Sequence, residues 1–284
     1  MKAAAVNQDA RPTISWAPGL HAPTGQRVDV SAYERYLGRW SRLFVPAVLA
    51  AAEVAAGDRV LDVAVGPGEA AAIALTRVGP MGLVVGVDIS CDMLEAARAR
   101  LHHNRLRLAA MDGQALAFPD SSFDRVVCQL GLMFFPDPVR GLAEFHRVLR
   151  KHGRAAVCVI STPERAPIWS VLAERLSHYL PDQREPLHLS FGLADPVQLG
   201  RMLGSVGFSD VRVSRERHDT TFESFDEYWC TIEQGVGSMP HAYRALPEVS
   251  RRAVRREVQA GLSRFETGGR LRMSLEMLIG AGRA

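Results

Sequence analysis

Apolar and polar residues follow two different periods along this chain, and the period switches at short intervals. Between residues 57 and 160, short apolar runs typical of buried strands alternate with segments whose apolar residues recur every three or four positions, as in amphipathic helices. The strand-like runs are 59–65, 83–88, 105–110, 123–130 and 155–160, and the helical segments are 69–78, 92–101 and 138–151. We expect Gly153 to cap the last helix. This alternation predicts a parallel, doubly wound α/β sheet.

The pattern differs on either side of this block. Residues 1–30 contain several prolines and glycines with little periodicity, which indicates a loose arm, and residues 31–56 have a helical pattern. Beyond Ser161 we expect helices at 168–180, 195–207, 224–233 and 247–265, and strands at 211–218 and 271–280, the last at the sheet edge. The predicted organisation is an arm with a capping helix over residues 1–56 and one domain over 57–284. Inserts at about 161–194 and 220–268 would form a helical substrate cover.

Composition narrows the class of protein. The 284 residues suffice for one large domain with inserts. The net charge of +3 arises from 34 basic and 31 acidic residues that are interleaved, which argues against a nucleic-acid partner. No apolar run approaches the roughly 18 residues of a membrane span, and the start lacks a signal-peptide core, so we expect no membrane partner and a cytoplasmic location. The four cysteines form no CxxC pair, and we expect no metal site.

The segment Asp62-Val-Ala-Val-Gly66-Pro-Gly68 lies at the end of the first predicted strand, with Asp62 inside the strand. Glycines allow a close approach of backbone to ligand, and the amides of the following helix would face that ligand. Gly66, Gly68 and Ala71 also fit the dinucleotide fingerprint, so an NAD-dependent oxidoreductase is one alternative. However, the carboxylate of Asp62 can meet the ammonium group of a bound amino acid moiety, which a dinucleotide lacks.

Polar residues also follow the next three predicted strands. Asp88 ends the second strand, where a carboxylate can accept hydrogen bonds from both ribose hydroxyls. After the third strand, Asp112 can accept from an adenine amino group while the backbone of Gly113 holds the ring edge. Gln129 ends the fourth strand. Because ligands of open α/β sheets bind at the carboxyl ends of the strands, these positions predict a nucleoside site.

Four blocks carry a resemblance to a known family. VLDVAVGPG, GVDIS, MDGQALAFPDSSFDRVV and FHRVLRKHGRAAV resemble the successive motifs of class I S-adenosylmethionine-dependent methyltransferases, within them the ubiquinone/menaquinone biosynthesis-like (methyltransferase type 11) group. The resemblance covers residues 31–160 well, and FGLADPVQLGRMLGSVGFSDVRV and MSLEMLIGAGRA extend it. It implies a Rossmann-like sheet of seven strands, six parallel and one antiparallel, and S-adenosylmethionine as the cofactor.

The resemblance also implies roles for individual residues. Asp62, Gly66 and Gly68 would hold the methionine part, which Gln129 would also line. Asp88 would hold the ribose, and Asp112 with Gly113 the adenine. The further cofactor-binding residues that it implies are Tyr36, Ala64, Ile89, Met93 and Met111. The chain departs from the family at Ala64, where glycine is usual, and at Val65, where a small polar residue or cysteine is usual. The alternative is a homologue that binds the cofactor for a non-methylating reaction such as cyclisation.

Methyl transfer is an in-line displacement from a sulfonium, which requires alignment and the exclusion of water. A base is needed only where the acceptor atom holds a proton, and the candidates are His178, His188, His218 and Tyr33. For each histidine taken alone, a surface or packing role is the favoured interpretation. The apolar residues of the inserts predict a medium-sized, partly apolar metabolite as acceptor, methylated at O, N or C.

A cluster of arginines, Arg251, Arg252, Arg255 and Arg256, lies on the predicted basic helix. It is either a solvated helix face or a site for a phosphate-bearing substrate or an acidic carrier protein. The sequence leaves a homodimer open.

Overall fold

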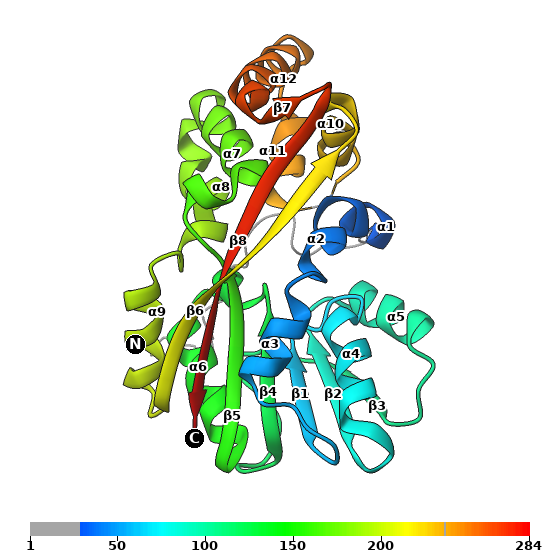
Figure 1. Ribbon diagram of the computed structural model, residues 1–284, viewed down its shortest axis with the longest axis vertical. Helices are drawn as coiled ribbons and strands as arrows, with labels where there is room; N and C mark the ends of the chain where they lie inside the picture. Colours follow the sequence, from blue (N-terminus) through cyan, green and yellow to red (C-terminus); the bar gives the residue numbers. More distant parts are fainter. Residues whose placement is uncertain (1–28, 236) are drawn as a thin grey trace, which may run out of the picture.

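The computed structural model describes residues 29–235 and 237–284 (Figure 1). The predicted loose arm lies almost entirely outside the described residues. Within those residues, a single mixed sheet has the strand order β3-β2-β1-β4-β5-β8-β6, and β7 pairs with β8. The strands are β1 (Arg59–Val63), β2 (Leu83–Asp88), β3 (Leu106–Ala110), β4 (Phe123–Gln129), β5 (Leu149–Ile160), β6 (Ser209–Phe222), β7 (Glu266–Thr267) and β8 (Arg270–Arg283). Strands β1 to β5 pair in parallel, and β8 pairs antiparallel to both β5 and β6. The predicted set of six parallel strands and one antiparallel strand is confirmed, and β7 was not predicted.

Helices cover both faces of this sheet, with α3 and α4 in front of it and α6 behind it in Figure 1. The helices beside the parallel strands are α3 (Val45–Ala51), α4 (Glu69–Val78), α5 (Cys91–Arg100), α6 (Pro138–Val148) and α9 (Pro196–Ser205). Polar side chains cap their starts as local sequence predicts. Ser90 accepts from the amide of Met93 at α5, and Asp195 accepts from the amide of Val197 at α9.

Two sequence predictions at the end of the sheet were wrong. Helix α6 ends at Val148 and β5 begins at the next residue, so Gly153 lies inside a strand and does not cap the helix. Instead of a helix cap, this part of β5 has an irregular register with β4 and a positive φ at His152. Strand β8 lies between β5 and β6 rather than at the edge. Its side chains are buried almost throughout, as in an interior strand, whereas those of β6 are mostly exposed or half-buried.

The pair β6–β8 extends beyond the sheet into a group of helices. The two strands pair from Ser209 and Arg283 to Phe222 and Leu271, whereas β5 follows β8 only as far as Met277. Around the extension, above the carboxyl ends of the other strands, lie helices of both inserts (Figure 1). They are α7 (Pro167–Tyr179), α8 (Arg184–His188), α10 (Phe225–Glu233), α11 (Ser238–Ala245) and α12 (Glu248–Leu262).

Hydrogen bonds tie the two inserts to each other. The hydroxyl of Tyr228 in α10 donates to the carbonyl of Ile168 in α7 at 2.8 Å, and the hydroxyl of Tyr179 donates to Glu257 in α12 at 2.6 Å. Segments that are distant in the sequence therefore form one helical layer. Short helical turns complete the chain: η2 (Gly79–Met81), η3 (Leu132–Phe134), η4 (Pro163–Arg165), η5 (Pro181–Gln183), η6 (Leu189–Phe191) and η7 (Ser263–Phe265).

The segment before α3 is helical but interrupted. It consists of α1 (Val30–Tyr33), the π-helix η1 (Glu34–Gly38) and α2 (Arg39–Ser41), and a turn separates it from α3. The predicted apolar stripe is buried, with Trp40, Phe44 and Val48 all less than a tenth exposed. The sequence predicted helix here without the π-helical turn.

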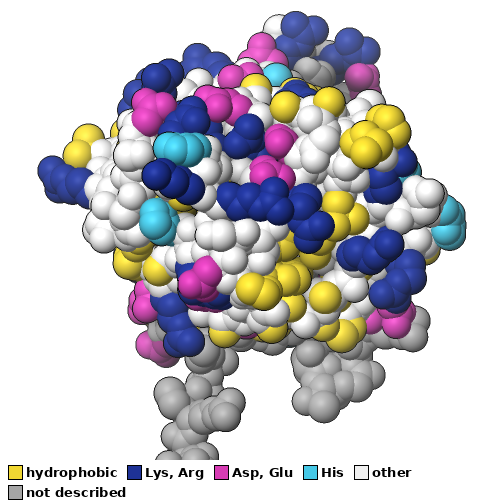
Figure 2. Space-filling view, turned by 90° about the horizontal axis from the view of Figure 1, so that it is seen from below, with side chains coloured by type: hydrophobic (Ala, Val, Ile, Leu, Met, Phe, Trp, Pro, Cys, Tyr) yellow, Lys and Arg dark blue, Asp and Glu magenta, His cyan; other side chains and the backbone are white. Residues whose placement is uncertain are grey.

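The surface carries mixed charge. Figure 2 shows basic side chains interspersed with acidic and apolar ones on the face seen from below. On the basic helix α12, Arg252 pairs with Glu248 and Arg255 pairs with Asp226 of α10. These pairs favour the solvated-face interpretation of the arginine cluster. None of the described helices has the length and apolar character needed to cross a membrane.

Candidate cofactor and acceptor site

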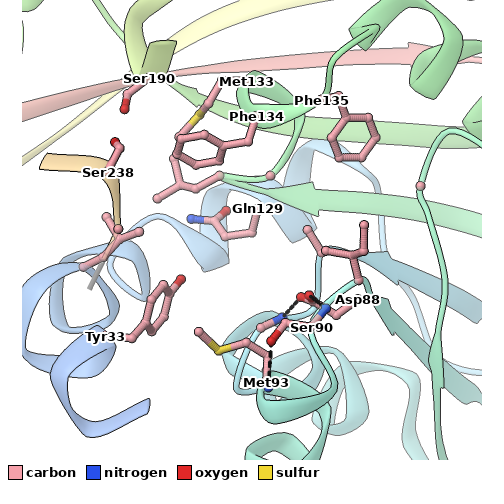
Figure 3. Close-up of a pocket in the computed structure, with 18 of the residues that line it drawn as sticks. Tyr33, Asp88, Ser90, Met93, Gln129, Met133, Phe134, Phe135, Ser190 and Ser238 are labelled. Atoms are coloured by element: carbon pink, nitrogen blue, oxygen red, sulfur yellow. Dashed lines mark hydrogen bonds between the residues drawn. The ribbon is translucent and has the colours of Figure 1, made fainter. Parts of the chain in front are cut away.

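A cavity lies where the strand ends meet the inserts (Figure 3). Its wall on the sheet side comes from the ends of β1, β2 and β4 and from the loops that follow β3 and β4. The other wall comes from the N-terminal helical segment and both inserts. The lining residues are Tyr33, Tyr36, Leu37, Val63, Ala64, Gly66, Asp88, Ile89, Ser90, Met93, Met111, Gly113, Gln129, Leu130, Gly131, Met133, Phe134, Phe135, Ile160, Trp169, Ser190, Gly237, Ser238 and Met239.

The turn after β1 depends on two glycines with left-handed backbone conformations. Gly66 has a φ of +53° and Gly68 a φ of +89°. Gly66 lines the cavity, so its backbone is exposed to a ligand there. Gly68 lies outside the lining and precedes α4, where a β-carbon would come 2.5 Å from Cδ1 of Leu101. The first glycine therefore serves the site, and the second allows α4 to begin close to α5.

Asp88 is fixed at the end of β2 by two backbone amides. Its Oδ2 accepts from the amide of Gly66 and its Oδ1 from the amide of Ser90, both at 2.9 Å (Figure 3). Burial raises the pKa of Asp88, and the two amides act in the opposite direction. Asp88 lines the cavity, so its carboxylate can also accept hydrogen bonds from a ligand.

Gln129 is oriented by the N-terminal segment. Its Nε2 donates to the carbonyl of Ser41 at 3.0 Å, and its Oε1 is buried without a hydrogen-bond partner. Buried acceptors are nearly always satisfied, so an unpartnered one in a cavity wall marks a place where a ligand donor fits. An amide oxygen of this kind suits an ammonium group.

Met111, Gly113 and Phe135 line a further part of the cavity, which we call the recess. A β-carbon on Gly113 would lie 2.5 Å from Cζ of Phe135 and 2.8 Å from Cγ1 of Val63. The absence of a side chain at Gly113 therefore lets Phe135 and Val63 pack against its backbone. Asp112 lies outside the lining, and its Oδ1 accepts from the amide of Gln114 at 2.8 Å. This bond stabilises the turn after β3, and the predicted contact of Asp112 with adenine stays a prediction.

Asp62 also lies outside the lining. Side chains alternate along a strand, and the next residue, Val63, lines the cavity. Both carboxylate oxygens of Asp62 are buried without a hydrogen-bond partner. Burial and the nearby charge of Asp88 raise the pKa of Asp62 to about 8. The predicted contact between Asp62 and a ligand ammonium stays a prediction, and Gln129, which does line the cavity, is a second candidate for that contact.

The structure does not bring the three candidate histidines to the cavity. His178 is exposed, 3.5 Å from Glu174. His188 contacts the hydroxyl of Ser177 at 3.1 Å, and burial lowers its pKa. His218 is 3.2 Å from Glu216, and its ring packs on Phe44 at a centroid distance of 4.8 Å. Each has an ordinary packing or surface environment.

Tyr33, the fourth catalytic candidate, does line the cavity. Its hydroxyl lies 3.9 Å from the position of a β-carbon on Gly66. Of the other residues that the resemblance implied, Tyr36, Ala64, Ile89, Met93, Met111, Gly113 and Gln129 line the cavity together with Gly66 and Asp88. This set comes from five separate segments, and the fold gathers it at one edge of the sheet.

A buried carboxylate beside the site was not predicted from the sequence. Oε2 of Glu69, the first residue of α4, accepts from the hydroxyl of Ser41 at 2.6 Å. Burial raises the pKa of Glu69 to about 7. Glu34 adds an ion pair to Arg100 of α5 at 2.9 Å. These contacts hold the N-terminal segment against the cofactor turn, and no sequence motif indicated them.

The sequence did not predict that the loop after β4 belongs to the site. This loop contributes Leu130, Gly131, Met133, Phe134 and Phe135 to the lining. Its position at the carboxyl end of a parallel strand was the available signal. Ser190 and Met239, from the two inserts, had no motif around them.

Comparison with known proteins identifies the family. Residues 61–157 match the sequence profile of a family described as a methyltransferase domain. The chain is 34% identical over 166 residues to a demethylmenaquinone methyltransferase of Corynebacterium kroppenstedtii. The aligned region covers 55% of this chain and 69% of that protein. The chain belongs to the methyltransferase domain family. The predicted family resemblance is confirmed.

A second relative of this methyltransferase domain is the ubiquinone/menaquinone biosynthesis C-methyltransferase of Stenotrophomonas maltophilia. It is 43% identical over 126 residues, which cover 43% of this chain and 48% of the relative. The chain thus spans about half the length of that curated relative.

Solved structures agree on the fold. A SAM-dependent methyltransferase from Aquifex aeolicus matches with a TM-score of 0.50 and 19% identity, covering 66% of this chain and 91% of that one. A Haemonchus contortus phosphoethanolamine N-methyltransferase 2, in complex with phosphomonomethylethanolamine and S-adenosylhomocysteine, matches with a TM-score of 0.57 and 20% identity, covering 89% and 56%.

Proposed function

We propose that this chain is an S-adenosylmethionine-dependent methyltransferase that acts on a small molecule. The observation that carries the proposal is the pairing of two acceptors in one cavity. Asp88 is held by the amides of Gly66 and Ser90, and Gln129 offers an unpartnered oxygen. A nucleoside joined to an amino acid presents ribose hydroxyls and an ammonium group, which match these two acceptors.

The remaining cofactor half fits the same molecule. The ribose belongs with Asp88, the adenine with the recess between Met111, Gly113 and Phe135, and the amino acid part with Gly66 and Gln129. When bound, S-adenosylmethionine supplies an electrophilic methyl group on a sulfonium. The protein has to hold the acceptor in line with that carbon and keep water away.

The inserts are suited to this second task. We propose that residues 161–194 and 220–268 form the substrate cover of the domain 57–284, with the helical portion of residues 1–56 closing its other side. Trp169, Ser190, Ser238 and Met239 of the inserts line the cavity opposite the strand ends. The names of the curated relatives, which act on demethylmenaquinone or in quinone biosynthesis, support a small-molecule acceptor and include a C-methyltransferase.

Calorimetry with S-adenosylhomocysteine and with NAD tests the cofactor. We expect S-adenosylhomocysteine to bind and NAD not to bind. Gln129→Met removes the acceptor for the ammonium group and should weaken S-adenosylhomocysteine roughly tenfold, since hydrogen bonds to charged groups contribute about 1.5–3 kcal/mol. Gln198→Met, an exposed change on α9, is the matched control. NAD binding without S-adenosylhomocysteine binding would contradict the proposal.

A second experiment separates methyl transfer from a non-methylating use of the cofactor. The purified protein is incubated with methyl-labelled S-adenosylmethionine and a small-metabolite extract, and label is measured in the solvent-extractable fraction. We expect labelled product. Binding of the cofactor with no transfer to any fraction would favour a homologue that uses the sulfonium for another reaction.

A further inference from the structure

Two tyrosines of one helical segment line the same cavity but have different neighbours. The hydroxyl of Tyr33 lies over the cofactor turn, 3.9 Å from the β-carbon position of Gly66. Tyr36 instead lies beside the second insert, with its Cβ 3.1 Å from the β-carbon position of Gly235 in the loop between α10 and α11. The π-helical turn η1, which begins between them, separates the two side chains.

The hydroxyl of Tyr36 has no partner in the structure. Tyr36 is 7% exposed, and its Oη is buried without a hydrogen bond. Leaving a buried hydroxyl unsatisfied is unfavourable, so this oxygen marks a place for a complementary polar atom. Burial raises the pKa of Tyr36 well above neutrality, so the hydroxyl keeps its proton and can donate it in a hydrogen bond.

The cavity that Tyr36 lines is largely apolar and contains aromatic rings. Trp169, Phe134, Met133 and Met239 contribute aromatic and thioether surfaces, which favour contact with a ring. Among the described lining residues Asp88 alone carries a charged side chain, and two amides already hold it on the cofactor side. A charged acceptor group would therefore be buried without a counter-ion, at a high cost in free energy.

The hydroxyls of the inserts continue the same pattern. Figure 3 shows the side chains of Ser190 and Ser238 pointing toward one another at the insert edge of the cavity. Both are neutral groups that can donate or accept a hydrogen bond. The acceptor half thus offers hydroxyls and apolar surface, which suits a molecule with oxygen substituents on an apolar ring.

We infer that Tyr36 is an acceptor-binding residue, which donates a hydrogen bond to an oxygen of an uncharged, largely apolar, ring-bearing methyl acceptor, and that Tyr33 belongs to the cofactor half. The roles are the reverse of those that the sequence predicted for these two tyrosines. The inference rests on the proposed function, because it divides the cavity into a cofactor half and an acceptor half.

Calorimetry with matched probes tests this division. 1-Naphthol and naphthalene share a ring system and differ by one oxygen, and each is titrated into protein saturated with S-adenosylhomocysteine. We expect 1-naphthol to bind the unmodified protein about five- to tenfold more tightly than naphthalene, as one neutral hydrogen bond allows. Tyr36→Phe should abolish this ratio and change the affinity for S-adenosylhomocysteine less than about twofold.

Tyr33→Phe is the matched control, because it removes the same atom from the same segment. It should preserve the ratio between the two probes and weaken S-adenosylhomocysteine instead. A third probe, 1-naphthyl phosphate, should bind at least about tenfold more weakly than 1-naphthol, since its charge finds no partner. Thermal melts of both variants verify that they fold.

The inference is overturned if Tyr36→Phe keeps the ratio, if 1-naphthyl phosphate binds as tightly as 1-naphthol, or if neither ring probe binds. Each of these outcomes is compatible with normal binding of S-adenosylhomocysteine. Failure of S-adenosylhomocysteine itself to bind the unmodified protein would instead contradict the proposed function, so the two failures are distinguishable.

Discussion

Ala64 and Gly131 share a space that holds only one β-carbon. Ala64 follows β1 with a φ of +58°, in the left-handed region that favours glycine. A β-carbon on Gly131, in the loop after β4, would lie 2.5 Å from the Cβ of Ala64. The chain thus has alanine where its family usually has glycine, and a glycine on the neighbouring strand end gives room for the extra methyl group.

This relationship predicts coupled effects on stability. Ala64→Gly should raise the free energy of unfolding by about 1 kcal/mol, because a left-handed residue with a β-carbon costs roughly 1–2 kcal/mol. Gly131→Ala should lower it by about 1–3 kcal/mol through overpacking. In the double variant the net loss should be smaller than the sum of the two single effects by about 1 kcal/mol or more, measured by urea denaturation as a double-mutant cycle. Strictly additive effects would show that the two residues do not compete for space.

A second prediction concerns Asp88. Asp88→Asn removes the negative charge and places an amide group against the backbone donors of Gly66 and Ser90. S-adenosylhomocysteine should bind more weakly by about 1.5–3 kcal/mol, measured by calorimetry. Asp112→Asn makes the same chemical change outside the lining and should cost far less. Equal losses in the two variants would mean that the carboxylate of Asp88 does not contact the ligand.

Local sequence sufficed for the parts of the fold that depend on local physics. The glycines of the first turn, the cap at Asp195 and the short buried strands were all readable from neighbouring residues. The place of β8 between β5 and β6 was not, because pairing between distant strands is decided by burial on both faces. Gly153 misled for a related reason: glycine suits a helix end and a strand bulge alike.

The site shows the same division. Asp88 and Gly66 lie at strand ends, so their meeting follows from the topology of a parallel sheet. Gln129 could be placed at the crevice, but the bond from its amide to Ser41 depends on how an N-terminal segment packs. The π-helical turn that begins after Tyr33 and contains Tyr36 could not be predicted from the sequence, because no local pattern distinguishes it from an α-helix.

A third prediction follows from Glu69. Its pKa is about 7 in the folded protein, against 4.5 for an ordinary glutamate. Between these values the folded state binds more protons than the unfolded chain, so the free energy of unfolding falls as pH rises from about 4.5 to 7, and the loss is complete above 7. Asp62, with a pKa of about 8, acts in the same direction.

Glu69→Gln removes this titration and keeps an oxygen that can accept from Ser41. Relative to the unmodified protein, the variant should gain about 1–3 kcal/mol of stability between pH 5 and pH 8, measured by urea denaturation at both values. The exposed change Glu185→Gln should show no such trend. A stability difference that stays constant with pH would mean that Glu69 ionises as an ordinary exposed glutamate does.

A fourth prediction concerns communication between the two halves of the cavity. The N-terminal segment contacts the cofactor side through the bond from Ser41 to Glu69. On the insert side, the guanidinium of Arg39 lies 3.3 Å from Glu227 of α10 and over the ring of Phe222 at 5.2 Å. Binding of S-adenosylhomocysteine should therefore slow hydrogen exchange first in residues 30–41 and, through Arg39, also in α10.

Arg39→Met breaks the link to α10 and leaves the cofactor contacts in place. In this variant S-adenosylhomocysteine should still protect residues 30–41 while α10 exchanges as in the free protein. Arg42→Met, which removes a charge 3.8 Å from Glu34, is the control and should keep both effects.

In the unmodified protein with S-adenosylhomocysteine bound, adding 1-naphthol should extend protection to α7, which carries Trp169, because closing the acceptor half restricts local opening. If both inserts exchange equally fast in every state, they do not close over the acceptor, and the excluded-water environment for methyl transfer has to come from the sheet side alone.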